Sequence, residues 1–204
     1  LYPSSFTALA DEPRPTAESR LVSAEDANLF GVTFIDVDRG WSVGQHGTIL
    51  QTQDGGVNWK PQASGTSATL TSIAMYNSQR GLAVGGQTQA YSQCSLGEVV
   101  ITMDGGKAWQ VITGHDLPRL RKLIIGPNGQ CVAAGDWSHV HLSSVFTSRD
   151  GGMNWTPQVS PMVGHAIGLA GTVDDYLVLS EQGEVIRFRQ DAAPRVILPA
   201  NQDW

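Results

Sequence analysis

The amino-acid sequence predicts an all-β fold made of repeated four-stranded antiparallel sheets, the architecture of a β-propeller. Three observations carry this prediction. A self-similar unit recurs along the chain at intervals of 50 and 46 residues. Each copy divides into four short apolar or alternating segments, which is the pattern of β-strands. Turn residues separate these segments, and the chain holds 23 glycines. Repeats of about 40 to 50 residues with four strands each are typical of propeller blades.

Three copies of the unit are in phase, and a fourth is degenerate. The first reads LFGVTFIDVDRGWSVGQHGTILQTQDGGVNW. The second has RGLAVGG where the first has RGWSVGQ, and the third has SRDGGMNW where the first has TQDGGVNW. The fourth keeps the rhythm but lacks the Asp-Gly-Gly turn, as terminal repeats often do. We expect blades near residues 29–62, 70–112, 120–159 and 165–198. About four visible blades form either a small propeller or an arc of a larger one.

Residues 1–28 differ from the rest of the chain in composition. They include Pro3, Pro13 and Pro15, mixed polar residues and no sustained periodicity. This composition predicts an extended N-terminal arm or linker, followed by propeller repeats over residues 29–200.

The turn that closes each of the first three units fits Ser/Thr-x-Asp-x-Gly-x-x-Trp. Its aspartate can accept hydrogen bonds from turn N–H groups, its glycine permits positive φ, and its tryptophan supplies a large apolar surface. Equivalent turns around a ring cannot converge on one substrate atom, so we expect a structural role rather than a catalytic one. The predicted structural residues are Asp54, Gly56, Trp59, Asp104, Gly106, Trp109, Asp150, Gly152 and Trp155.

This turn resembles the Asp-box, or bacterial neuraminidase repeat. With the upstream phrase GWSVG at residues 40–44, the unit is similar to the photosystem II stability/assembly factor type of propeller. The resemblance implies a noncatalytic protein-interaction or assembly module for a membrane-associated complex, with a protein partner and an exported, for instance periplasmic, location. Two alternatives stay open: a sialidase-related propeller that binds or hydrolyses glycans, and a structural subunit of a larger assembly.

Composition and motifs narrow the function classes further. The formal net charge is -6, which argues against a nucleic-acid-binding role. No run approaches the roughly 18 apolar residues of a membrane-spanning helix. The sequence holds no nucleotide fingerprint or nucleophile elbow, and its tyrosines lie in no recognisable catalytic phrase. We therefore expect a protein that is not an enzyme and needs no cofactor.

Binding residues are sought among the less repetitive positions. Arg119, Arg121 and Lys122 concentrate positive charge in an acidic chain, which favours an anionic partner surface, although solvated loop charges would look the same. The insertions at 87–96 and 136–143 supply Tyr91 and Trp137 as candidate contacts.

Two further groups of side chains carry alternative interpretations. Asp136, His139 and His141 have a metal-ligand composition, but an exposed loop is the default for such an insertion. Cys94 and Cys131 are compatible with one disulfide or with two small buried side chains.

Overall fold

The predicted fold class is confirmed: the chain forms four four-stranded antiparallel sheets. The computed structural model describes residues 27–88, 95–114, 116–138, 142–162 and 164–200. In every sheet the strands follow chain order, so each blade is a simple meander whose consecutive strands are hydrogen-bonded neighbours. None of the described residues forms a helix long and apolar enough to cross a membrane.

The strands of the four blades have the following bounds. The first blade holds β1 (Leu29–Phe34), β2 (Gly40–Gly44), β3 (Ile49–Thr52) and β4 (Lys60–Gln62). The second holds β5 (Thr69–Met75), β6 (Gly81–Thr88), β7 (Ser95–Thr102) and β8 (Gln110–Ile112). The third holds β9 (Leu120–Ile125), β10 (Cys131–Ser138), β11 (Ser143–Ser148) and β12 (Thr156–Pro157). The fourth holds β13 (Ala166–Gly171), β14 (Asp175–Ser180), β15 (Val185–Arg189) and β16 (Ala192–Leu198). Two short 3-10 turns, η3 (Gln45–Gly47) and η4 (Pro127–Gly129), interrupt the hairpins.

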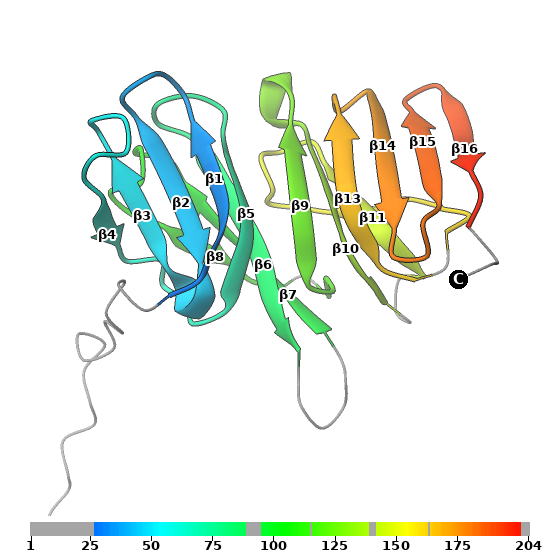
Figure 1. Ribbon diagram of the computed structural model, residues 1–204, viewed down its shortest axis with the longest axis horizontal. Coiled ribbons are helices and arrows are strands. Elements are labelled where there is room, and N and C mark those ends of the chain that lie inside the picture. Colours follow the sequence, from blue (N-terminus) through cyan, green and yellow to red (C-terminus); the bar gives the residue numbers. More distant parts are fainter. Residues whose placement is uncertain (1–26, 89–94, 115, 139–141, 163, 201–204) are drawn as a thin grey trace, which may run out of the picture.

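The blades stand in a row, with the first and fourth at opposite ends (Figure 1). Their first strands contact one another in succession, β1 with β5, β5 with β9 and β9 with β13. The first strand of each blade is therefore the inner strand of the arrangement, and the last strand lies at its outer edge. This places the starts of the four inner strands on one common rim.

The core lies between the blades, because alternate residues of each strand face opposite neighbours. In the second blade, Leu82 and Val84 pack with residues of the third, whereas Ala83 and Val100 pack with residues of the first. A third apolar cluster joins the third and fourth blades around Val145, Val178 and other buried residues. Each blade thus buries its two faces only by stacking on its neighbours.

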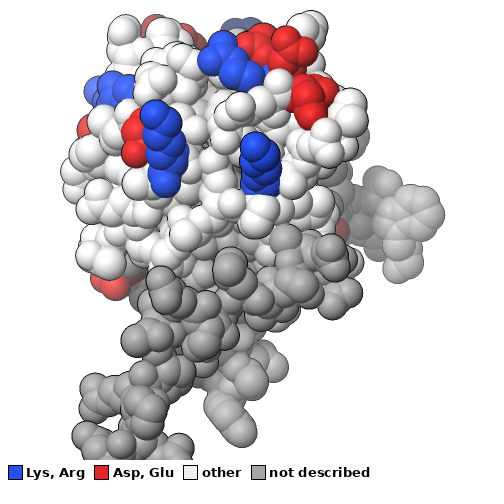
Figure 2. Space-filling view, turned by 90° about the vertical axis from the view of Figure 1, so that its left-hand side faces the viewer, with Lys and Arg blue, Asp and Glu red and all other residues white. Residues whose placement is uncertain are grey.

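The outer faces of the first and fourth blades lack such neighbours among the described residues. Val32 and Phe34 are 62% and 45% exposed, although the matching residues of the second blade, Ile73 and Met75, are buried against the first blade. This end of the row carries few charged groups (Figure 2). At the other end, Leu177 and Leu179 are partly exposed. The described residues therefore form an open arc of blades.

Candidate functional site

The Asp-box aspartates are held by their own turns. Thr52 Oγ1 donates to Asp54 Oδ1 at 2.8 Å and accepts the N–H of Gly56 at 2.9 Å. Asp54 also accepts the backbone N–H of Asn58 at 2.8 Å. The second and third turns repeat the arrangement around Asp104 and Asp150. Because each carboxylate satisfies donors that its turn leaves unpaired, it acts on the fold of its own hairpin.

These hydrogen bonds also set the charge state of the turns. The backbone N–H of Asn58 lowers the pKa of Asp54, and that of Ala108 lowers the pKa of Asp104. Burial pushes the pKa of Asp150 upward, but the hydrogen bonds from Asn154 and Ser148 outweigh it and the net shift is downward. All three groups are therefore held as carboxylates, which cannot serve as general acids near neutral pH.

The three Asp-box tryptophans do not make equal contacts. The indole N–H groups of Trp59 and Trp155 donate to carbonyl oxygens of their own turns, those of Gly56 and Gly152. The indole N–H of Trp109 instead donates across the blade boundary to Gln62 Oε1 at 2.9 Å. Trp109 is also the most enclosed of the three and belongs to the core cluster between the first two blades.

Each inner strand carries a β-bulge at the same place, near its start. The register shifts at Phe30, Thr71, Arg121 and Ile167 in the four blades. A bulge redirects the side chain of the extra residue. The same bulge occurs on all four inner strands of the described residues. Thr71 illustrates the redirection, since its hydroxyl donates to the carbonyl oxygen of Leu120 in the next blade at 2.6 Å. The bulged residues therefore form a row along the inner strands, which we call the bulge row.

Arg121 of the bulge row belongs to a charged cluster around Asp136. The Asp136 side chain is 5% exposed and lies on β10, beside β9. Arg121 Nε donates to its Oδ1 at 2.7 Å, and Arg119 Nε lies 3.2 Å from its Oδ2. Because two guanidinium groups face one buried carboxylate, the cluster carries a net positive charge. Both arginine side chains are about one-third exposed, so a partner can reach them.

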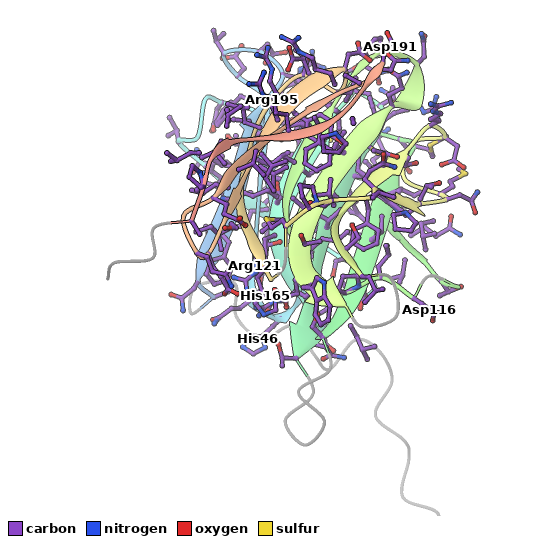
Figure 3. The ribbon with its side chains drawn as sticks, turned by 90° about the vertical axis from the view of Figure 1, so that its right-hand side faces the viewer. His46, Asp116, Arg121, His165, Asp191 and Arg195 are labelled. Carbon is purple, nitrogen blue, oxygen red and sulfur yellow. The ribbon has the colours of Figure 1, made fainter. Side chains whose placement is uncertain are left out.

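His165 completes this cluster from the start of the fourth blade. Its Nδ1 accepts the backbone N–H of Trp137 at 3.0 Å and lies 3.6 Å from Asp136 Oδ1. Arg121 and His165 lie near one another, at the end of the molecule opposite Asp191 and Arg195 (Figure 3). We call Arg119, Arg121, Asp136, Trp137 and His165 the rim cluster.

The structure sorts the binding residues that the sequence suggested. Arg119 and Arg121 come together with Trp137, as part of the rim cluster, whereas Lys122 is exposed and makes no ion pair with a described residue. Tyr91, His139, His141 and Cys94 lie outside the described residues. The buried Asp136 carboxylate is balanced by Arg119 and Arg121, so its burial is explained without a metal ion. Cys131 is a buried free thiol, and burial raises its pKa to about 11.

Both predicted insertions begin as continuations of the β-hairpins. Gln87 and Thr88 still pair with Leu96 and Ser95, and β10 continues to Ser138. From the sequence, these residues were predicted to be insertions between the second and third strands of their blades. Backbone pairing does not require apolar side chains, so the ladders continue past the core.

Sequence reasoning also missed Phe30 and Ile167, which are 50% and 41% exposed on the bulge row. The repeat alignment held a clue, because Phe30, Arg121 and Ile167 each come one residue after the first residue of their inner strand. Nothing in a single sequence indicates that this column is bulged, so alternation alone would have assigned it to the wrong face.

Four meander blades, three of them closed by an Asp-box turn, define this chain as an Asp-box β-propeller protein. The family model described as "Photosynthesis system II assembly factor YCF48" matches residues 17–191, and the chain belongs to this family. This confirms the family resemblance drawn from the Asp-box motifs.

Three relatives illustrate the likeness. The chain is 26% identical over 198 residues to the photosystem II assembly protein Ycf48 of Thermosynechococcus vestitus, covering 79% of this chain and 56% of that protein. A solved structure of YCF48 bound to D1 peptide shares 22% identity with a TM-score of 0.61, over 82% of this chain and 55% of the other. YCF48 from Cyanidioschyzon merolae shares 19% identity with a TM-score of 0.62, over 86% and 57%. The chain thus spans a little over half the length of these relatives.

Proposed function

We propose that this protein is a noncatalytic module that binds an extended segment of a protein partner during the assembly or stabilisation of a membrane-associated complex. The partner contacts the rim cluster and the adjoining bulge row. The single observation that carries the proposal is the pair of arginines gathered on Asp136, in line with the exposed Ile167 on the neighbouring inner strand β13. Family membership supports the same role, since a relative is described as a photosystem II assembly protein.

The chemistry of the rim cluster suits a peptide with carboxylate groups. Guanidinium groups bind carboxylates through paired N–H donors, and Asp136 fixes the position of both arginines while balancing only one of their two charges. Phe30 and Ile167 offer apolar contacts on either side of Arg121 along the bulge row. A partner segment with acidic and apolar residues in alternation would satisfy both kinds of contact.

The same geometry supports a role without catalysis. Each Asp-box carboxylate satisfies its own turn, and Asp136 is paired with two arginines. Acid–base catalysis needs a group able to exchange a proton near neutral pH, beside the reacting atoms. The described acidic residues of the Asp-boxes and the rim cluster are instead committed to structural contacts.

A binding measurement with a matched control tests the proposal. A fluorescently labelled D1 peptide, of the kind bound by the solved relative, is titrated with the chain and followed by anisotropy. We expect saturable binding that weakens at least tenfold in R121S and stays unchanged in R195S. The control removes the same charge from an exposed arginine at the opposite end of the molecule (Figure 3). Equal affinity of the two variants, or no saturable binding by the wild type, would contradict the proposal.

A further inference from the structure

The junction between the third and fourth blades contains a groove with a volume of about 360 Å³. Thr147 and Gln158 line it from the third blade, and Tyr176, Phe188 and Pro194 line it from the fourth. Its volume falls in the range of about 300–1,000 Å³ that is usual for small-ligand pockets. The groove lies beside Asp191, at the end of the molecule opposite the rim cluster (Figure 3).

The first junction has a cleft at the equivalent place, and it is about half as large. This cleft has a volume of about 170 Å³ and is lined by Trp41 and Gln51 of the first blade. Trp41 corresponds to Val132 of the third blade, and Gln51 corresponds to Thr147. The two sites can therefore be compared residue by residue. The comparison shows which side chains fill the first junction and are missing from the third.

Trp109 fills the first junction, and the fourth blade has a proline in its place. Gln110, which follows Trp109, pairs with Ile101 on β7. Arg195, which follows Pro194, pairs with Arg187 at the equivalent place on β15, so Trp109 and Pro194 hold the same position in their blades. Trp109 is 8% exposed and packs within the apolar cluster of the first junction. The fourth blade has lost the whole Asp-box turn, so it supplies no Asp-box tryptophan to the third junction.

The hydrogen-bond acceptor that receives the Trp109 indole is nevertheless present at the third junction. Gln62 Oε1 accepts from Trp109, and Gln62 Nε2 donates to Gln51 Oε1 at 3.0 Å. Gln158 follows Trp155 by three residues, as Gln62 follows Trp59. Its Nε2 donates to Thr147 Oγ1 at 2.9 Å, on the residue equivalent to Gln51. The acceptor and its anchor are therefore both in place.

The second junction provides an internal control for this relationship. Ile112 pairs with Val99 where Gln62 pairs with Ile49, so the second blade has no amide at this position. The corresponding tryptophan, Trp155, turns its indole N–H to the Gly152 carbonyl of its own turn. A cross-junction indole bond thus occurs where a glutamine is available to accept it.

We propose that the groove between the third and fourth blades binds a tryptophan side chain of a protein partner, with the indole N–H donated to Gln158 Oε1. The stacked rings of Tyr176 and Phe188, 5.0 Å apart, form an apolar wall of the groove. Arg189 lies 3.3 Å from Asp175 and is paired within its own blade, whereas Arg149 lines the groove as a further cation that could face an acidic residue beside that tryptophan. This site is separate from the rim cluster and does not depend on the proposed function.

Nuclear magnetic resonance titration with two small probes tests the assignment. N-acetyl-L-tryptophanamide is expected to produce saturable shifts in the Gln158 side-chain amide and in the Tyr176 and Phe188 rings. N-acetyl-L-phenylalaninamide lacks the N–H donor and is expected to bind about fivefold more weakly, the loss that one modest hydrogen bond produces. In Q158L, the two probes are expected to bind equally. Absence of saturable shifts at these three residues in the wild type, or a tryptophan preference that survives in Q158L, would overturn the proposal.

Two further variants calibrate the measurement. P194W supplies an indole from the chain itself at the position of Trp109, so the probe shifts at Gln158 are expected to disappear. W109A empties the first junction, so the probe is expected to shift the Gln62 amide there. Unchanged probe binding in a folded P194W, or binding at Gln62 of W109A without binding at Gln158 of the wild type, would also overturn the proposal.

Discussion

The indole nitrogen of Trp109 and the side-chain oxygen of Gln62 lie 2.9 Å apart and join the first two blades across their shared core. The same Asp-box residue in the first blade, Trp59, donates its indole N–H to the Gly56 carbonyl of its own turn and rests edge-on against Phe34. One motif therefore serves two purposes: it closes a hairpin in each of the first three blades, and it joins two blades where a neighbouring blade offers an acceptor.

Replacing Trp109 with alanine is expected to destabilise the chain far more than the same change at Trp59. Trp109→Ala removes a buried aromatic side chain and leaves the Gln62 acceptor without its donor, a loss of about 3–5 kcal/mol in the free energy of unfolding. Trp59→Ala removes a half-buried ring at the open end of the arc and is expected to cost less than half as much. Urea denaturation of both variants checks this, and equal losses would contradict it.

The second glycine of each Asp-box offers another matched pair. Gly56 and Gly106 have φ angles of +92° and +86°, so an alanine is strained at either position. At Gly106 the added methyl group would also lie 2.5 Å from Gln62 Oε1 and 2.8 Å from Trp41 Nε1, whereas at Gly56 its nearest neighbour is 3.6 Å away. We expect Gly106→Ala to lower the melting temperature clearly more than Gly56→Ala. Indistinguishable melting temperatures would show that the first junction can relax around the methyl group.

The lowered pKa values of the Asp-box aspartates predict acid sensitivity. A carboxyl group whose native pKa lies below its unfolded value contributes stability above the unfolded pKa. That stability is lost as the pH falls through the native pKa, so the effect lies below about pH 4 for Asp54, Asp104 and Asp150. We expect the fall in urea midpoint from pH 7 to pH 3 to be smaller in the triple variant D54N/D104N/D150N than in the wild type. The same fall in both proteins would contradict the linkage.

The open end of the arc is tested by two equivalent apolar residues. Ile73 is buried between the first two blades, and Val32 holds the matching position on the outer face of the first blade. Ile73→Ala is expected to cost about 2–5 kcal/mol, as buried large-to-small changes do. Val32→Ala is expected to change the unfolding free energy of the isolated chain by less than about 0.5 kcal/mol. A comparable loss at Val32 would mean that this face is covered in solution.

The strand pattern and the Asp-box turns could be predicted from the sequence because both are local. The spacing of Asp54 and Trp59 within one hairpin fixes their turn chemistry, and repetition at Asp104 and Asp150 makes the pattern visible. The rim cluster was only partly predictable. Arg119 and Arg121 stood out by charge, but their pairing with Asp136 depends on a bulge and on the neighbouring strand, neither of which has a sequence signal.

The third junction shows the same limit of local reasoning. The loss of the Asp-box from the fourth blade is visible in the sequence, and it predicts an atypical terminal repeat. That Pro194 then faces Gln158 across a groove depends on strand register and on blade stacking. Long-range contacts of this kind require the assembled structure.

Hydrogen exchange measured with and without a bound D1 peptide tests the proposed partner surface most directly. We expect slower exchange in residues 117–123 and 164–169, which carry Arg119, Arg121 and His165 of the rim cluster and the bulge row of the last two blades. We expect unchanged exchange in the Asp-box turn at 148–155. Protection confined to the Asp-box turns, or no protection at 117–123 when the peptide is bound, would contradict the proposed partner surface.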